Sequence, residues 1–197
     1  MQVKKIAIMT GLLSVFIAPV AMAESTGKLY VAIDSGSARY SGITFGAGTL
    51  GAGTYPNPGL INIALGYHYN EQVAAEVGLA KFGDSNLYAN GRSTTISATS
   101  IHVAAVGSYP LDSALGLFGK VGIAYNYNSL NGSGDAALLS KSANHIGLIY
   151  GVGAQLHLYQ DWDIHMQYVN FGEFGELGDT GSPMKATALT MGVAYSF

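Results

Sequence analysis

The sequence contains no cysteine among its 197 residues, so neither a disulfide bond nor a thiolate metal site can form. Charged residues are also scarce, at 11% of the chain, which is unusually low for a protein with a water-soluble surface. After the first 23 residues, no segment approaches the roughly 18 consecutive apolar residues of a membrane helix. The chain is therefore rich in apolar residues without showing the pattern of a membrane-spanning helix.

The N-terminal segment has the composition of a secretory signal peptide. Two lysines precede an apolar stretch over 6–20, and Ala21 and Ala23 then form a small-residue cleavage motif. We expect a signal peptide over 1–23, cleaved after Ala23. A permanent membrane anchor is the alternative, but the stretch is short for a spanning helix and contains Pro19.

Basic residues are too few for a nucleic-acid-binding protein. Without the signal peptide, seven Lys and Arg remain against twelve Asp and Glu, which gives a net charge near −5. No basic patch for nucleic acid is therefore expected. Residues 24–197 contain no Pro-rich, Ser-rich or charged linker, so we expect a single domain over this range.

Strict alternation of large apolar and small residues runs through residues 24–197. In the last thirteen residues, Leu189, Met191 and Val193 alternate with small residues such as Gly192 and Ala194. A period of two is typical of a β-strand whose two faces meet different environments. Eight segments show it to varying degrees: 28–36, 60–69, 73–82, 97–109, 115–128, 144–158, 162–171 and 185–197.

The connections between these segments alternate in length. Three are short, at 70–72, 110–113 and 159–161, and four are long and rich in Gly, Ser and Asn, at 37–59, 83–96, 129–143 and 172–184. This arrangement predicts an all-β fold, an eight-stranded antiparallel up-and-down transmembrane β-barrel with short periplasmic turns and four longer extracellular loops. We expect it in the cell outer membrane.

The residues of the small face indicate which side of the barrel points inward. A soluble barrel of the lipocalin kind would need a solvent face rich in Lys, Glu and Thr, whereas this face is mostly Gly, Ala, Ser, Asn and His. Such residues suit a narrow interior. Glu76, His102 and Lys120 share this parity, and we expect them to form a polar cluster in the lumen, with the acid and the lysine paired.

Aromatic residues near the strand ends predict girdles at the two membrane interfaces. Those expected at the turn end are Tyr67, Tyr69, Tyr109, Trp162, Tyr195 and Phe197. Those expected toward the loop end are Phe82, Tyr125, Tyr127 and Tyr168.

The histidines and the serines offer little chemistry. All five histidines lie on the small-face parity, and a three-residue turn would place His157 opposite His165. No third ligand completes a metal site there, so polar packing is favoured and neither a metal nor a cofactor is expected. Lipid A deacylases carry a His-x-Ser pair, which is absent. Asp84-Ser85 only faintly resembles the Asp-Ser of the palmitoyltransferases and suits a turn better.

The segment TMGVAYSF resembles the terminal signature of outer-membrane barrel proteins, through Thr190, Gly192, Tyr195 and Phe197. The resemblance implies recognition by the outer-membrane assembly machinery.

Four further stretches resemble the transmembrane domain of the OmpA-like family of small barrels: KLYVAIDSGSARYSG, NEQVAAEVGLAKFGD, VGSYPLDSALGLFGKVGIAY and GVGAQLHLYQDWDIHMQY. The resemblance implies a lumen-facing acid on the third strand, with basic residues on neighbouring strands that interrupt a water path. The peptidoglycan-binding domain of longer family members has no counterpart here, so tethering to the cell wall is not carried over.

These features predict a non-catalytic outer-membrane protein with a structural or surface-interaction role, such as envelope integrity or adhesion. A narrow channel for small solutes is the alternative, and a lipid A-modifying enzyme is less favoured. The expected partners are outer-membrane lipid, lipopolysaccharide, the assembly machinery and a host or cell-surface ligand of the loops. We expect a monomer.

Overall fold

The computed structural model describes residues 27–42, 57–89, 92–133, 141–159, 161–176 and 183–197. The predicted signal peptide, with Ala21 and Ala23, lies outside the described residues. No helix within the described ranges is long and apolar enough to cross a membrane.

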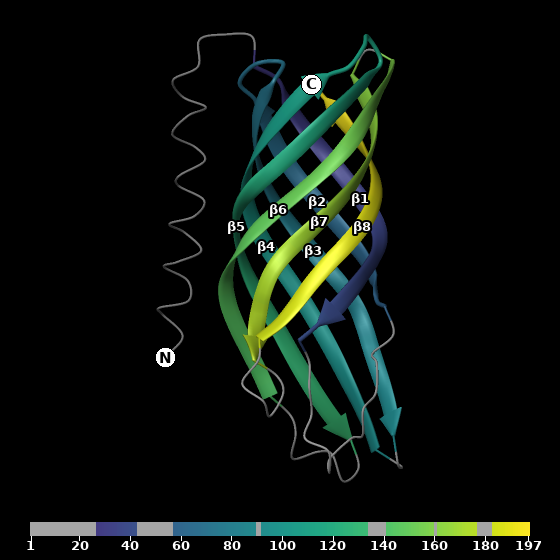
Figure 1. The fold of residues 1–197 in the computed structure, drawn as a ribbon, viewed down its shortest axis with the longest axis vertical. Coiled ribbons are helices and arrows are strands. Elements are labelled where there is room, and N and C mark those ends of the chain that lie inside the picture. The colour runs from purple at the N-terminus through teal and green to yellow at the C-terminus, as the bar shows by residue number, and fades with distance from the viewer. Residues whose placement is uncertain (1–26, 43–56, 90–91, 134–140, 160, 177–182) are drawn as a thin grey trace.

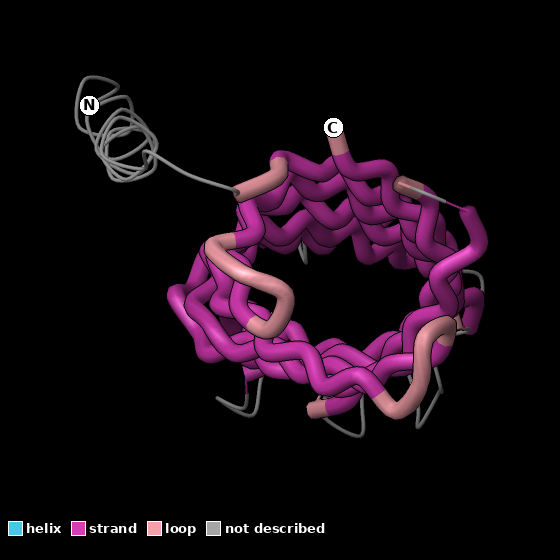
Figure 2. Tube along the Cα trace, turned by 90° about the horizontal axis from the view of Figure 1, so that it is seen from above, coloured by secondary structure: helices cyan, strands magenta, loops and turns pink. Residues whose placement is uncertain are grey.

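Eight antiparallel strands form one closed barrel, which confirms the predicted fold. They are β1 (Leu29–Ser41), β2 (Gly59–His68), β3 (Val73–Ala89), β4 (Arg92–Pro110), β5 (Leu115–Ser133), β6 (Lys141–Tyr159), β7 (Trp162–Glu176) and β8 (Pro183–Ser196). Each strand pairs with its neighbour in sequence, and β1 also pairs with β8. Figure 1 shows the tilted strands, and the view along the barrel in Figure 2 shows the closed ring.

The two ends of the barrel are named here by their connections. The turn end carries the short β2–β3, β4–β5 and β6–β7 connections and the last residue, at the top of Figure 1. The loop end carries the other four connections.

One predicted long loop, 83–96, is instead mostly strand. β3 and β4 pair as far as Ala89 and Arg92, after a register shift that follows Phe82. Polar side chains support this extension, since Thr95 donates a hydrogen bond to Asn86 at 2.6 Å directly across the ladder. A Ser- and Asn-rich composition does not distinguish a loop from a strand held by such pairs. Strands also extend into the other three predicted loops.

The outer and inner faces of the barrel wall carry the residues that the alternation predicts. Large apolar residues point outward on all eight strands, and Ile33, Leu79, Val121 and Leu189 are each about half exposed. Residues of the small parity are buried inside, where glycine gives larger neighbours room. A side chain at Gly66 would clash with the Tyr30 ring.

The interior differs between the two halves of the barrel. In the loop half, buried apolar side chains form a cluster that we call the loop-half core: Ala38, Leu60, Ala80, Phe82, Ile96, Ala98, Ala124, Leu130, Ile149, Val169, Phe171, Phe174, Met184, Ala186 and Ala188. Every strand contributes to it. In the turn half, a smaller apolar cluster around Tyr30 and Val106 accompanies an open cavity.

Phe82 was predicted to belong to the outer aromatic girdle, and this is wrong. Its side chain is only 1% exposed and lies inside the barrel. Phe82 shares the parity of Glu76, and that parity, rather than its place near a strand end, determines its direction. Tyr125, Tyr127 and Tyr168 do point outward.

Candidate functional site: the barrel lumen

The structure brings Glu76, His102 and Lys120 together inside the barrel. Lys120 Nζ lies 2.8 Å from Glu76 Oε1, and His102 Nε2 lies 3.5 Å from the same oxygen. Tyr30 donates a hydrogen bond to the other oxygen, Glu76 Oε2, at 3.2 Å. All four residues are less than 10% exposed. The carboxylate is thus held between a cation and a hydroxyl donor, at buried positions beside the barrel interior.

The strand registers explain this meeting. His102 of β4 lies opposite Gly78 of β3, and Val106 of β4 lies opposite Lys120 of β5. Lys120 therefore starts near the turn end and reaches Glu76 across β4. On the other side, Glu76 pairs with Gly66 of β2, whose missing side chain lets the Tyr30 ring of β1 pass over it.

A second buried carboxylate, Asp34, was not singled out from the sequence. His165 Nε2 lies 2.6 Å from Asp34 Oδ1, and Gln167 donates to the same oxygen at 2.9 Å. Asn62 donates to Asp34 Oδ2 at 2.8 Å. The signal was available, because Asp34 lies on the inward parity of β1, two residues from Ala32 and four from Tyr30.

Gly192 provides space for the Asp34 cluster. A Cβ atom at this position would lie 2.7 Å from Asp34 Oδ1 and 2.9 Å from His165 Nε2. Thr190 is also buried in the lumen. The other two residues of the predicted assembly signature point outward, since Tyr195 contacts Trp162 at 4.9 Å between ring centroids and Phe197 is 61% exposed. The signature positions thus divide between lumen and girdle.

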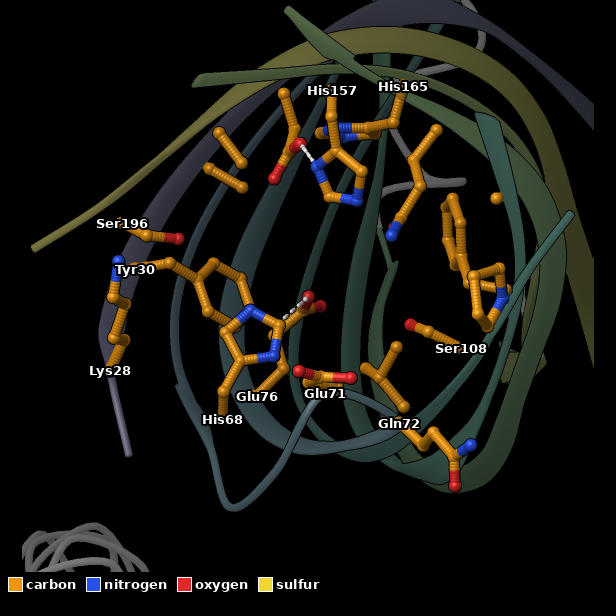
Figure 3. Close-up of a pocket in the computed structure, with 18 of the residues that line it drawn as sticks. Lys28, Tyr30, His68, Glu71, Gln72, Glu76, Ser108, His157, His165 and Ser196 are labelled. Carbon is orange, nitrogen blue, oxygen red and sulfur yellow. Dashed lines mark hydrogen bonds and ion pairs between the residues drawn. The ribbon is translucent and has the colours of Figure 1, made fainter. Parts of the chain in front are cut away.

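A cavity of about 990 Å³ occupies the turn half and ends near these two clusters. Figure 3 shows Tyr30, Glu76 and His165 projecting into it from different strands. Polar side-chain pairs lie along its rim: Lys28 Nζ is 2.9 Å from Asp161, and His157 contacts Asp163. The turn half is therefore a polar vestibule.

The predicted pairing of His157 with His165 is wrong. His157 faces Asp163, while His165 faces Gln155. Positions 157 and 163 are equidistant from residue 160, so a three-residue turn at 159–161 already makes them partners, and the expected pairing of 157 with 165 is two residues out of register. Among the described residues, no group of three or more His, Asp or Glu side chains could hold a metal ion.

The loop-half core lies inside the barrel beyond the polar clusters. The Phe82 ring packs edge-on against Phe171, at 5.2 Å between centroids, and against Phe174, at 5.5 Å. Phe171 also contacts the His102 ring at 6.0 Å. Such edge-to-face pairs are favourable beyond the area that they bury. The apolar core thus lies directly on the Glu76 cluster.

Comparison with known proteins identifies the kind of barrel. The family described as "Outer membrane protein beta-barrel domain" matches residues 8–197. A search of curated proteins found no match.

Several solved structures share the fold at low sequence identity. Neisserial surface protein A is 17% identical, with a TM-score of 0.65, and the match covers 88% of this chain and 100% of that one. Ail, the attachment invasion locus protein of Yersinia pestis, in complex with the heparin analogue sucrose octasulfate, is 17% identical with a TM-score of 0.59 over the same shares. The N-terminal β-barrel domain of Pseudomonas aeruginosa OprF is 13% identical, with a TM-score of 0.57 over 87% of this chain and 100% of that one.

Proposed function

Because the chain belongs to the outer membrane protein β-barrel family, we propose that it is a non-conducting, non-catalytic outer-membrane protein that acts through its loop end. In this proposal the loop end faces the cell exterior, the turn end faces the periplasm, and a cleaved signal peptide directs export. Its role is structural or adhesive. The observation that carries the proposal is the loop-half core, to which all eight strands contribute.

The loop-half core supports a closed lumen because its side chains leave no accessible surface. Phe82, Ile96, Leu130 and Phe174 are each at most 1% exposed. An eight-stranded barrel has room for side chains and little else, so large apolar groups from facing strands exclude a continuous column of water. Solute transport through this state is therefore not expected.

The distribution of charge favours a partner at the loop end. Exposed cationic side chains lie in the loop half, on four different strands: Arg39, Lys81, Lys141 and Lys185. Asp84, Glu173 and Glu176 lie in the same half, and Glu173 pairs with Lys185 at 3.2 Å, so the other three cations are the ones tested below. Cations near one membrane face attract anionic headgroups. We therefore propose lipopolysaccharide phosphates, or a sulfated surface polysaccharide, as the ligand.

The comparison with Ail adds support for a sulfated ligand, since that protein was crystallised with a heparin analogue. We further propose that the protein is monomeric and that the outer-membrane assembly machinery inserts it. No catalytic role is proposed, because the buried carboxylates are both paired with donors and lie under the loop-half core.

Planar-bilayer recording tests the closed lumen. The wild-type protein should show no steady conductance, and a stable open channel would contradict the proposal. The mass of lipid A should be unchanged in cells with and without the protein, and a modified lipid A would contradict the non-catalytic role.

Binding of lipopolysaccharide and of heparin to protein in detergent tests the partner. A variant with Arg39→Ala, Lys81→Ala and Lys141→Ala should lose affinity for at least one of them. Lys28→Ala, which removes a cation at the turn end, is the matched control and should bind like wild type. Equal binding by both variants would contradict the proposed site.

A further inference from the structure

The wall of the barrel is not uniformly paired, and β6 and β7 separate in the loop half. Their ladder reaches Tyr150, opposite Asn170, and goes no further among the described residues. From Lys141 to Ile149, the described pairing of β6 is with β5 alone. We call Phe171–Glu176 of β7 the inturned segment, since it separates from β6 at this point while it still pairs with β8.

The inturned segment lies over the inner face of β6. A Cβ atom at Gly147 would meet the Glu173 backbone nitrogen at 3.1 Å, and one at Gly175 would clash with Ala143. Gly147 and Ala143 share the inward parity of Ile149. Small residues on both strands thus permit the close approach of one strand to the face of the other.

Side chains, rather than a β-ladder with β6, hold the inturned segment. Asn126 Nδ2 donates to the carbonyl oxygens of Phe171 and Glu173, at 2.7 and 2.8 Å. Asn128 Nδ2 donates to the Gly175 carbonyl at 3.0 Å. Both asparagines belong to β5, which is not a neighbour of β7 in the barrel. These bonds replace part of the pairing that β6 would supply.

Two register shifts against β8 give the inturned segment its direction. Asn170 pairs with Thr187, Glu173 with Lys185 and Glu176 with Pro183, so β7 gains one residue at each step. Gly172 lies at the first shift with a φ of +77°, in the left-handed region that favours glycine. As a result, Phe171 and Phe174 both point inward, although they are three residues apart.

The same sequence also fits a continuous wall. If the β6–β7 ladder continued past Tyr150, Leu148 would pair with Gly172 and Ile146 with Phe174. The plain alternation would then turn Phe174 outward, beside Ile146, which is 66% exposed. Glu173 and Gly175 would face the lumen, next to Asn126. The loop half would exchange one of its three buried phenylalanines for a polar and a small residue.

We infer that the inturned segment is a gate that exchanges between two states. In the lumen position, seen here, Phe174 points inward, and in the wall register β7 pairs with β6 past Tyr150. The wall register admits water and small polar solutes to the loop half. This inference rests on the proposed function, because it takes the closed barrel as the resting state. Gly172 permits both states, since glycine adopts positive and negative φ with similar ease. Entry of a small solute would therefore depend on how often β7 rejoins β6.

Disulfide trapping detects the wall register directly. The sequence has no cysteine, so a pair introduced as Ile146→Cys and Phe174→Cys is the only one in the protein. In the lumen position these side chains lie on opposite faces of the wall, at 66% and 0% exposure, where no disulfide can form. Crosslinking under a membrane-permeable oxidant is expected, at a slow rate set by opening.

A matched pair controls for folding and for the oxidant. Val152 and Tyr168 are directly opposite each other and both point outward. The pair Val152→Cys and Tyr168→Cys should therefore crosslink quickly and completely. If this control pair crosslinks and the pair Ile146→Cys and Phe174→Cys never does, the gate does not exist.

Gly172→Ala changes the balance between the two states. An alanine disfavours the positive φ and would clash with the Leu148 carbonyl oxygen in the lumen position, whereas it suits the wall register. We expect crosslinking of the Ile146 and Phe174 cysteines to become about tenfold faster, which corresponds to about 1.4 kcal/mol. Gly42→Ala is the control, because Gly42 also has a positive φ, of +81°, but lies at the end of β1. An equal effect of both substitutions would overturn the gate.

Access of a reagent provides a second measurement that leaves Phe174 in place. Ser100 is fully buried in the lumen, and Ser100→Cys should react slowly with a small thiol reagent added at the loop end. Gly172→Ala should increase this rate about tenfold, and Gly42→Ala should not. Unchanged rates would exclude the gate while the closed barrel stands. A steady conductance of the wild type would instead remove the proposed function itself.

Discussion

The two halves of the lumen are built on opposite principles, although the same eight strands form both. In the turn half the registers are largely regular, and the two buried carboxylates have partners, as Glu76 has in Lys120 and Asp34 in Asn62. In the loop half the ladder is interrupted in β3 and β7, and apolar side chains fill the space. The comparison teaches that one barrel can combine a wet vestibule with a dry core, provided that bulges redirect a few side chains.

The largest expected effect comes from breaking the polar half. Lys120→Met leaves Glu76 as an unpaired, buried charge, and removing one partner of a buried pair typically costs about 3 to 5 kcal/mol. Urea unfolding in detergent micelles measures the loss. Adding Glu76→Gln should recover part of it, because the charge is then gone. If the two substitutions add independently in a double-mutant cycle, the pair contributes no coupling.

Breaking the apolar half should cost about as much or slightly less. Phe82→Ala removes the ring at the centre of the aromatic cluster, and truncation of a buried phenylalanine typically costs about 3 to 5 kcal/mol. The same unfolding experiment measures it. Tyr168→Ala, on the outer face, is the control and should cost less. Equal losses would mean that the loop-half core is not tightly packed.

A smaller effect on stability is expected at the predicted assembly signature. Phe197→Ala should reduce the amount of assembled protein in cells strongly, if the position is read by the assembly machinery. Refolding of the purified chain into detergent should change little, since burial of one such side chain contributes only about 1 to 3 kcal/mol and Phe197 is mostly exposed. Quantitative immunoblotting of membranes and a refolding assay separate the two. Equal loss in both assays would assign Phe197 a purely structural role.

The smallest effect concerns a turn, outside both halves. The backbone N–H groups of Ala114 and Leu115 donate to Asp112 at 2.7 Å and hold its pKa below the usual value. Because the pKa of Asp112 is lower in the folded than in the unfolded protein, the ionised side chain stabilises the fold at pH values above its ordinary pKa of about 4. This stabilisation is lost as the pH falls through the folded pKa. The stability difference between wild type and Asp112→Ala should therefore shrink on acidification below about pH 4. A difference that is independent of pH would assign the effect to the turn backbone alone.

Much of the fold could be predicted from the alternation of side chains. The parity of each strand gave the inward direction of Glu76, His102 and Lys120, because side chains on one strand alternate strictly in a regular ladder. The same rule would have placed Phe82 inside and would have revealed Asp34. Position near a strand end therefore does not predict the direction of an aromatic side chain, and a single acid in an apolar strand is a signal of a lumen-facing carboxylate.

Other features depend on tertiary contacts that no local pattern contains. Phe171 and Phe174 both point inward only because of the shift at Gly172, and nothing in the sequence distinguishes this arrangement from a plain strand. The strand extension past Phe82 depends on pairs such as Asn86 with Thr95, whose composition resembles a loop. The partner of His157 depends on the register between β6 and β7, and an error of two residues in that register exchanges Asp163 for His165.

The central claim, a wet turn half and a dry loop half, is tested most directly by cysteine accessibility along β4, which passes through both. Single cysteines would replace inward residues from Ser108 and Val106, beside the vestibule, to Ala98 and Ile96, in the loop-half core. With a small charged thiol reagent added at the turn end, the account predicts rapid reaction at the first two positions and near-complete protection at the last two. Similar reaction rates at all four positions would show a continuous water path and contradict the account.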